Sequence, residues 1–214
     1  MMPTVLSGVN IPLTTKYVLR ALSSTGRVHH ETRHVRFPPE HVFSVVSNVA
    51  RYSKFVPWCT ASRIQKGPTA IRDSEGRVTE INLDAQLAIG FQLLSEKYTS
   101  RVKLFPYTYI EAVSRDTTVF DKLVTKWKFS PGRDLNTCRI DFFLEFQFRN
   151  ALYGQASTLF FDEVVQEMVN AFDKECLRVE RSANRGLSRA VRRQQKPLRI
   201  DRMKAEWWDK RIGS

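Results

Sequence analysis

The chain has 214 residues, of which 42% are hydrophobic and 11% aromatic, enough for one compact domain with a hydrophobic core. No stretch approaches the roughly 18 apolar residues that a transmembrane helix needs, so none is expected. The formal net charge of +12 would suit a nucleic-acid-binding or membrane-surface protein. The excess positive charge lies at the two ends of the chain, however. Residues 31–177 carry 19 basic and 18 acidic side chains, which nearly cancel.

The first 28 residues have the composition of a targeting segment. Residues 1–30 contain three basic side chains and no acidic one, and a short helix would place Tyr17, Val18, Ala21 and Leu22 on one side. An acid-free amphipathic segment of this kind predicts a mitochondrial transit peptide over residues 1–28. A disordered leader without a targeting role is the alternative.

The first elements after this segment are a strand and a helix. Residues His29–Phe37 predict the strand, and Pro38 and Pro39 end it. Pro39 suits the first turn of a helix, and the following EHVFSVVSNV carries apolar residues at helical spacing. Residues 52–58 predict a short helical turn that Pro57 terminates.

A run of antiparallel strands follows, recognised by alternating apolar and polar residues. The expected strands cover residues 59–65, 81–91, 96–105, 121–129 and 139–149, and an exposed hairpin loop covers residues 67–76. The residues assigned to the buried face are Ile81, Leu83, Ala85, Leu87, Ile89, Phe91, Tyr98, Val102, Leu104, Leu123, Trp127, Phe129, Ile140, Phe142, Leu144, Phe146 and Phe148.

After Asn150, a good N-cap residue, the apolar spacing changes to steps of three and four. The repeat predicts one long amphipathic helix to about Arg181, with an apolar stripe of Leu152, Ala156, Leu159, Phe160, Val164, Met168, Ala171 and Phe172. One long helix closing an aromatic sheet face predicts an α+β helix-grip fold, in which a curved antiparallel sheet wraps around the C-terminal helix. The expected domain therefore covers residues 29–181, followed by a basic C-terminal extension over 182–214.

Five segments, taken together, resemble a known family. They are VVSNVARYSKFVPWCTAS, SEKYTSRVKLFPYTYIEAV, KWKFSPG, RIDFFLEFQFRNALYGQ and FFDEVVQEMVNAF, in order between about His29 and about Val179. The combination resembles the mitochondrial coenzyme Q-binding protein family, a branch of the START-like, polyketide-cyclase-type lipid-binding folds. The segment 67–80 is longer than the family pattern, and the tail after Val179 has no counterpart in it.

The resemblance implies an internal hydrophobic cavity that binds ubiquinone or a polyprenylated precursor, without a cofactor and without catalysis. It implies a non-enzymatic lipid chaperone, peripheral on the matrix side of the mitochondrial inner membrane, that supports coenzyme Q synthesis and delivery to the respiratory chain. Its partners would be the membrane surface and the ubiquinone-synthesis or respiratory complexes. The alternatives are a packed aromatic core without a cavity, and an enzyme acting on a polyprenylated aromatic compound.

The lipid-binding residues implied by the resemblance lie on the inner faces and in one segment before the sheet. Phe55, Pro57 and Trp58 are expected at the mouth of the cavity, where Trp58 either stacks on a quinone ring or wedges between the short helix and the sheet. The remaining expected lipid-binding residues are Leu87, Ile89, Phe91, Trp127, Phe142, Leu144, Phe146, Leu159, Phe160 and Val164.

The sequence offers little that would support catalysis or metal binding. Cys59, Cys138 and Cys176 are widely spaced, which indicates a reducing compartment and neither a disulfide framework nor a zinc site. His30 and His34 share a spacing of four but fall on a strand, and a phosphate loop and a nucleophile elbow are absent. The inward positions named above contain no acid or base, so we assign no catalytic residue and no metal ligand.

Two groups of charged residues remain open to alternatives. Residues 178–214 carry 12 basic and four acidic side chains together with Trp207 and Trp208. This tail could bind anionic lipid, contact RNA of the mitochondrial ribosome or its assembly, or remain solvated and partly helical. Asp162 and Glu163 predict a solvated helix face, with a polar latch for a quinone head group as the alternative.

Overall fold

The computed structural model describes residues 26–91, 94–116 and 118–194, and of residues 91, 94, 151–160 and 189–194 it describes the backbone only. The expected transit peptide, and Trp207 and Trp208 of the tail, lie outside the described residues. The chain divides into two compact units, Met1–Asp173 and Lys174–Ser214. The sheet and everything discussed below as a site belong to the first unit.

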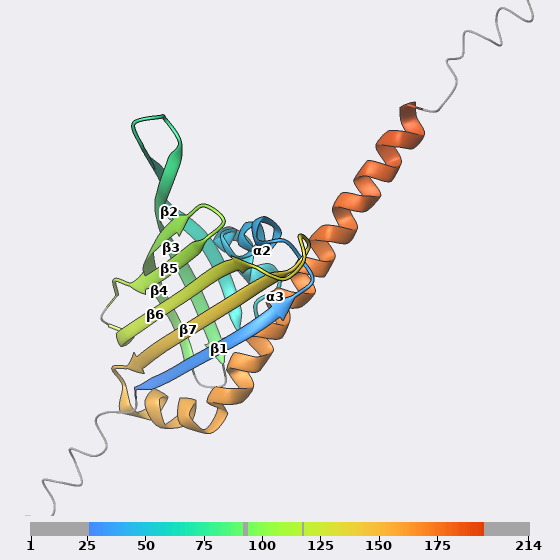
Figure 1. The fold of residues 1–214 in the computed structure, drawn as a ribbon. Coiled ribbons are helices and arrows are strands. Elements are labelled where there is room, and N and C mark those ends of the chain that lie inside the picture. The colour runs from blue at the N-terminus through green and yellow to red at the C-terminus, as the bar shows by residue number, and fades with distance from the viewer. Residues whose placement is uncertain (1–25, 92–93, 117, 195–214) are drawn as a thin grey trace, which may run out of the picture. The chain divides into compact units, whose positions relative to one another are not determined.

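Within the described ranges, seven antiparallel strands form one sheet (Figure 1). The order across the sheet is β1-β7-β6-β5-β4-β3-β2, so each strand from β2 onwards lies beside its successor and β1 returns to pair with β7. The strands are β1 (Arg27–Val35), β2 (Cys59–Arg72), β3 (Val78–Phe91), β4 (Leu94–Phe105), β5 (Tyr109–Ser114), β6 (Phe120–Pro131) and β7 (Cys138–Phe148). The predicted run of antiparallel strands is confirmed, with β5 as a strand that the sequence reasoning had not separated from its neighbours.

The two α-helices begin where the sequence predicts, whereas the short helical turn expected at 52–58 lies earlier, at Val49–Lys54. Helix α2 (Pro39–Val46) has proline in its first turn, the 3₁₀ helix η1 (Val49–Lys54) follows, and α3 (Ala151–Gln194) starts directly after Asn150. Helix α3 continues well beyond the expected end near Arg181. The added stretch contains Ala, Leu, Arg and Gln, which are good helix formers, and no proline.

The first part of α3 packs on the inner face of the curved sheet, and the two enclose the core (Figure 1). The Phe161 ring lies 5.4 Å from the Phe146 ring of β7, and the Phe172 ring lies 5.0 Å from the Trp127 indole of β6, measured between ring centroids. A curved antiparallel sheet closed by a long C-terminal helix is the helix-grip arrangement, so the predicted fold class is confirmed.

The apolar stripe of α3 departs from the prediction over residues 161–169, whereas Ala171 and Phe172 are buried as predicted and the side chains of 152–160 lie outside the described residues. Phe161, Val165 and Val169 are buried, whereas Val164 and Met168 are only half-buried. The sequence contains adjacent apolar pairs at 160/161, 164/165 and 168/169, so helical spacing alone fits either stripe. Packing against β7 and β1 decides between them.

The connection between β2 and β3 is shorter than predicted because both strands continue into the expected loop. Pairing extends from Cys59 to Arg72, and the turn contains only residues 73–77. Figure 1 shows this hairpin projecting beyond the rest of the sheet. Gly67 has a φ of 90°, and a Cβ there would lie 2.7 Å from the Asn82 carbonyl oxygen, so the irregular pairing at this point requires glycine.

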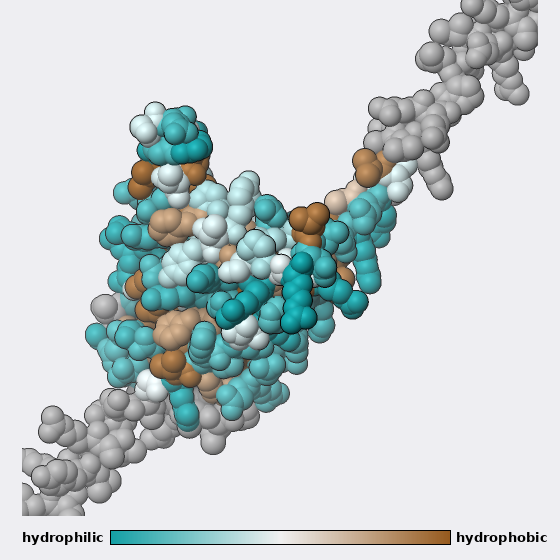
Figure 2. Space-filling model, in the orientation of Figure 1, coloured by the Kyte–Doolittle hydropathy of each residue, from teal (hydrophilic) through white to brown (hydrophobic). Residues whose placement is uncertain are grey.

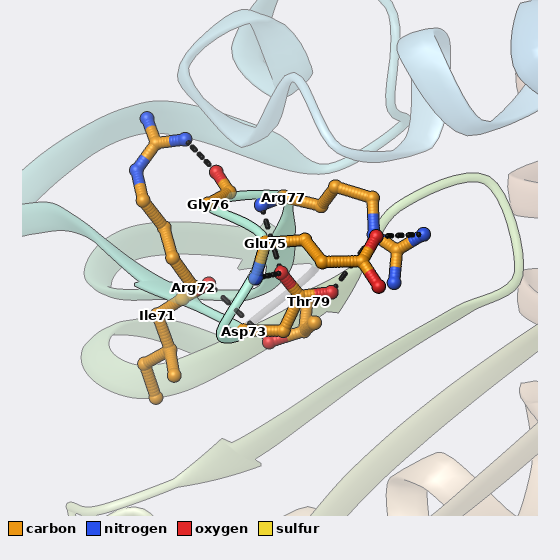
Figure 3. A network of polar contacts seen from close by, with 7 residues as sticks. All are labelled: Ile71, Arg72, Asp73, Glu75, Gly76, Arg77 and Thr79. Carbon is orange, nitrogen blue, oxygen red and sulfur yellow. Dashed lines mark hydrogen bonds and ion pairs between the residues drawn. The ribbon is translucent and has the colours of Figure 1, made fainter.

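Polar contacts order the tip of the hairpin (Figure 3). The Asp73 carboxylate accepts hydrogen bonds from the backbone amides of Glu75 and Arg77 and from Arg77 Nε, each at 2.9 Å. Arg72 Nη1 donates to the Gly76 carbonyl oxygen at 2.7 Å. The hydrogen bond from the Arg77 side chain, together with those from the two backbone amides, holds the pKa of Asp73 below its usual value. The carboxylate therefore stays ionised and keeps its acceptor role.

The outer face of the sheet is mostly hydrophilic, and its apolar side chains are separated from one another (Figure 2). Ion pairs join neighbouring strands there, for example Lys122 of β6 with Glu145 of β7 at 2.7 Å. The sheet therefore has one solvated face and one core face, as the alternating sequence predicts.

Candidate functional site

Small side chains occupy the centre of the inner face of the sheet. The strand register places Ala85 opposite Ser100 and Ser100 opposite Ser114, while Ala112 lies opposite Thr125 on the next row. Larger inward residues surround them: Leu87, Tyr98, Leu123, Leu144 and Phe146. This arrangement leaves less side-chain volume at the centre of β3–β6 than at its borders.

Several of these central positions keep accessible surface although they face inward. Ala112 and Thr125 are half-buried, whereas Val102 and Ile110 beside them are 2% and 3% exposed. Side chains on the neighbouring positions therefore do not fill the space above Ala112 and Thr125. Leu87, an inward residue of β3, is also half-buried, so neighbouring side chains do not fill the space above it either.

Ser100 lies in the middle of this small-residue region. Its residue surface is 4% exposed, and none of the described residues shares a hydrogen bond with its hydroxyl group. Among the described residues no buried side-chain oxygen or nitrogen lacks a hydrogen bond, so the Ser100 hydroxyl oxygen, which forms none, keeps some accessible surface. The Ser100 hydroxyl is thus available to a molecule that enters the space beside it.

Tyr98 is the next inward residue on β4. Burial raises its pKa well above the usual value, so the phenol remains protonated and keeps its donor at physiological pH. The ring packs edge-on against Phe120 with centroids 5.1 Å apart, and its strand partner is Leu87. Tyr98 therefore presents a neutral donor on the same face as Ser100.

Phe55 packs into an aromatic cluster at one side of this face. Its ring lies 5.7 Å from Tyr52 and 5.2 Å from Phe172, in edge-to-face geometry. Tyr52, whose pKa is raised by burial, donates its hydroxyl hydrogen to the Val46 carbonyl oxygen. The cluster thereby fixes η1 against the first part of α3.

Trp58 follows this cluster and joins the end of β3. It has a φ of 59°, and its carbonyl oxygen accepts a hydrogen bond from the Gly90 amide at 2.9 Å. Both Trp58 and Pro57 are half-buried. Neighbouring Cys59 is buried, which raises the pKa of its thiol to about 11, so the thiol stays protonated and unreactive at neutral pH.

A row of charged side chains faces inward on β1, at the edge of the sheet. Glu31 lies between His29 and Arg33, with nitrogen–oxygen distances of 3.2 and 3.0 Å, and Arg33 Nη1 lies 2.9 Å from Asp173 Oδ2 on α3. On β4, Glu96 lies opposite Ile89 on the same face as Tyr98. The sequence reasoning missed the charged groups of β1 because both faces of this strand are polar, so the alternation of apolar and polar residues does not identify an inner face there.

The β1 charges act first as a connection between the edge strand and α3. Desolvation raises the pKa of Asp173 despite the opposing effect of Arg33. We expect Arg33→Ala to lower the free energy of unfolding by about 1–2 kcal/mol at neutral pH, because Asp173 and Glu31 then face each other without a cation. Asp173→Asn should lower the free energy of unfolding by less, because Arg33 keeps its ion pair with Glu31.

The test is chemical denaturation of both variants as a function of pH. Because the folded-state pKa of Asp173 is raised, its ionised form opposes folding above that pKa, and the loss in Arg33→Ala should shrink as the pH falls toward it. Equal losses in the two variants at neutral pH would contradict this account.

The predicted lipid-binding residues divide into three groups by their placement. Leu87, Ile89, Trp127, Phe142, Leu144 and Phe146 lie on the inner face, the last four of them buried. Val164 is half-buried on α3, whereas the side chains of Phe91, Leu159 and Phe160 lie outside the described residues. Asp162 and Glu163 are exposed, as a solvated helix face requires, so neither forms a latch inside the fold.

Comparison with known proteins identifies the family to which this chain belongs. The model of a family described as polyketide cyclase / dehydrase and lipid transport matches residues 35–173, which contain the sheet from β2 to β7 and the first part of α3. The Dictyostelium discoideum protein named "Coenzyme Q-binding protein COQ10, mitochondrial" is 31% identical over 153 residues, covering 72% of this chain and 70% of that protein. The chain belongs to the coenzyme Q-binding protein family.

Other similar proteins include both coenzyme Q-binding proteins and a bacterial toxin. The Xenopus laevis "Coenzyme Q-binding protein COQ10 homolog B, mitochondrial" is 34% identical over 156 residues, covering 71% of this chain and 58% of that protein. This member of the coenzyme Q-binding protein family therefore spans less than two thirds of the frog relative. The Escherichia coli "Ribosome association toxin RatA" is 32% identical over 138 residues, covering 64% of this chain and 79% of that protein.

Among solved structures, the Zhui aromatase/cyclase from Streptomyces sp. R1128 superposes with a TM-score of 0.59. The two share 16% identity, and the match covers 74% of this chain and 98% of that one. At this identity the likeness establishes the helix-grip fold of the coenzyme Q-binding family member and nothing about its chemistry. Within residues 26–194, apart from the gaps, no helix combines the length and apolar character needed to cross a bilayer.

Proposed function

We propose that this chain is a non-enzymatic lipid chaperone that binds ubiquinone or a polyprenylated precursor between the inner face of the sheet and α3. The observation that carries the proposal is the small, partly accessible centre of the inner face around Ala112, Ser100 and Thr125. An apolar cleft with a few polar groups is the usual form of a small-molecule site. The coenzyme Q-binding names of the relatives support the choice of ligand.

The binding energy would come mainly from apolar contacts. Each square ångström of apolar surface removed from water contributes about 25 cal/mol, so a ring with its first isoprene units supplies enough for micromolar affinity after ordering costs. The inward aromatic and aliphatic residues provide such a surface. The remaining isoprenoid tail would stay close to a membrane.

A chaperone without catalysis fits the charged groups on the inner face of β1. Arg33 forms ion pairs with Glu31 and Asp173 at 3.0 and 2.9 Å, which connect β1 with α3 and give these charges a structural role without catalysis. The names of the frog and Dictyostelium relatives describe binding proteins, although one solved neighbour of this fold is an aromatase/cyclase. We therefore favour carriage of the quinone over its conversion.

The proposed place of action is the matrix side of the mitochondrial inner membrane, where the protein would be peripheral. The two coenzyme Q-binding relatives named above are called mitochondrial, and the acid-free residues 1–28 suit a transit peptide. There the chaperone would support coenzyme Q synthesis and pass the quinone to respiratory complexes.

The test is organic extraction of the purified full-length protein followed by mass spectrometry. We expect a polyprenylated quinone or a quinone precursor near one molecule per protein, depleted from a matched preparation of Ala112→Leu. Recovery of ordinary phospholipid alone, or of no lipid from protein that is folded, would refute the proposal.

A second candidate function is association with RNA of the mitochondrial ribosome or its assembly. It is favoured by the similarity to a bacterial protein named for ribosome association and by the basic residues at 178–214. Crosslinking in cell extracts, with and without nuclease, distinguishes the two. Nuclease-sensitive sedimentation with ribosomal particles and no extractable quinone would favour this second function.

A further inference from the structure

The inner face contains a polar spot that the expected lipid-binding residues do not include. Ser100 and Tyr98 are consecutive inward positions on β4, and inward neighbours on one strand are about 7 Å apart. The Ser100 residue is 4% exposed, and its hydroxyl oxygen keeps some accessible surface and forms no hydrogen bond with the described residues. The Tyr98 phenol stays protonated.

The chemistry of these two groups matches a quinone ring more closely than an isoprenoid chain. The carbonyl and methoxy oxygens of ubiquinone accept hydrogen bonds, and the ring carries no donor. Serine and protonated tyrosine supply neutral donors without a charge that would have to be desolvated. An isoprenoid chain, in contrast, would leave the Ser100 hydroxyl unsatisfied.

The position of Ser100 also separates it from the expected mouth of the cavity. The Trp58 carbonyl oxygen is bonded to the Gly90 amide, and Gly90 follows Ile89 on β3. The residue opposite Ser100 is Ala85, four residues from Ile89 and therefore about 13 Å along the strand. A quinone ring bonded at Ser100 is therefore centred well away from the Trp58 backbone.

We propose that Ser100 and Tyr98 donate hydrogen bonds to the ring oxygens of the bound quinone, so that the ring lies inward at the centre of β4 and the isoprenoid tail runs toward Trp58. This inference rests on the proposed ubiquinone-binding function and specifies the orientation of the ligand. It assigns Trp58 to the tail, in place of stacking on the ring.

The experiment compares two ligands on the full-length chain. One is ubiquinone with two isoprene units, and the other is the same two-isoprene tail on a benzene ring without oxygens. We expect Ser100→Ala and Tyr98→Phe each to weaken binding of the quinone about three- to tenfold and to leave binding of the oxygen-free analogue unchanged. Trp58→Ala should weaken binding of both ligands by the same factor, because both carry the tail.

Two controls keep the result interpretable. Tyr109→Phe removes a phenol hydroxyl from the opposite face of the sheet, one residue before inward Ile110, and should change neither affinity. Thermal unfolding checks each variant, and Tyr98→Phe, which preserves the ring, provides the test if Ser100→Ala does not fold.

The contradicting outcomes separate the orientation from the function. Equal losses for both ligands in Ser100→Ala and Tyr98→Phe, no loss for either, or a quinone-specific loss in Trp58→Ala would overturn the orientation while leaving quinone binding in place. If the wild-type chain binds the oxygen-free analogue as tightly as the quinone, the ring oxygens are not recognised and the orientation is wrong. Failure of the wild-type chain to bind the quinone at all would overturn the proposed function itself.

Discussion

Trp127→Ala is expected to lower the free energy of unfolding by about 3–5 kcal/mol, the usual loss when a large buried aromatic residue is truncated. Trp127 is 6% exposed, and its ring centroid lies 4.3 Å from Phe142 and 5.0 Å from Phe172. It therefore connects β6 and β7 with α3. Without the indole, the two phenylalanine rings lose their common contact and a large cavity remains.

The measurement is denaturant unfolding together with the amount of extracted quinone per folded protein. Leu135→Ala, at a residue that is 96% exposed, is the matched control and should change stability by less than about 0.5 kcal/mol. We expect the quinone content of Trp127→Ala to fall only in proportion to the folded fraction. A stable variant that has lost its quinone would instead assign Trp127 to the ligand and not to the core.

Ala112→Leu is expected to reduce quinone retention about tenfold with little change in stability. Ala112 faces inward on β5 and is half-buried, so the larger side chain can enter the accessible space above it. That space is the proposed position of the ligand. The added atoms should therefore exclude the quinone without displacing α3.

The control for this substitution is Ala85→Leu on β3. Ala85 lies on the same inner face but is fully buried, and overpacking such a site costs about 1–3 kcal/mol. Thermal unfolding and extracted quinone are measured for both variants. If Ala112→Leu destabilises the protein as much as Ala85→Leu, the inner face is a packed core and the proposed cavity does not exist.

Local sequence patterns predicted most of the secondary structure. Alternation in β3, β6 and β7 identified the inward residues, since successive side chains of a strand point to opposite faces whatever lies above them. Pro39 and Asn150 marked the starts of α2 and α3 because their effects act within one turn. The run of strands followed by one long helix then predicted the helix-grip fold, which the family resemblance also implies and the structural comparison confirms.

Local patterns failed where two arrangements have the same apolar spacing or where strand pairing overrides turn composition. Glycine, proline and aspartate at 67–76 predicted a loop, but backbone pairing with β3 holds most of this segment in strand up to Arg72. On α3, helical spacing alone does not show that Phe161 is buried, and its ring contacts with Phe146 and His29 do.

The sequence by itself determined which residues share a face of the sheet, where the helices begin and which family the chain resembles, because all three depend on order along the chain. Only the tertiary structure decided which inward residues are packed and which keep accessible surface. Phe142 and Ala112 are both inward by alternation, yet Phe142 is 2% exposed and Ala112 is half-buried. The difference arises because burial depends on side chains brought together from distant segments, here His29 of β1 and Trp127 of β6 around Phe142, and alternation carries no information about them.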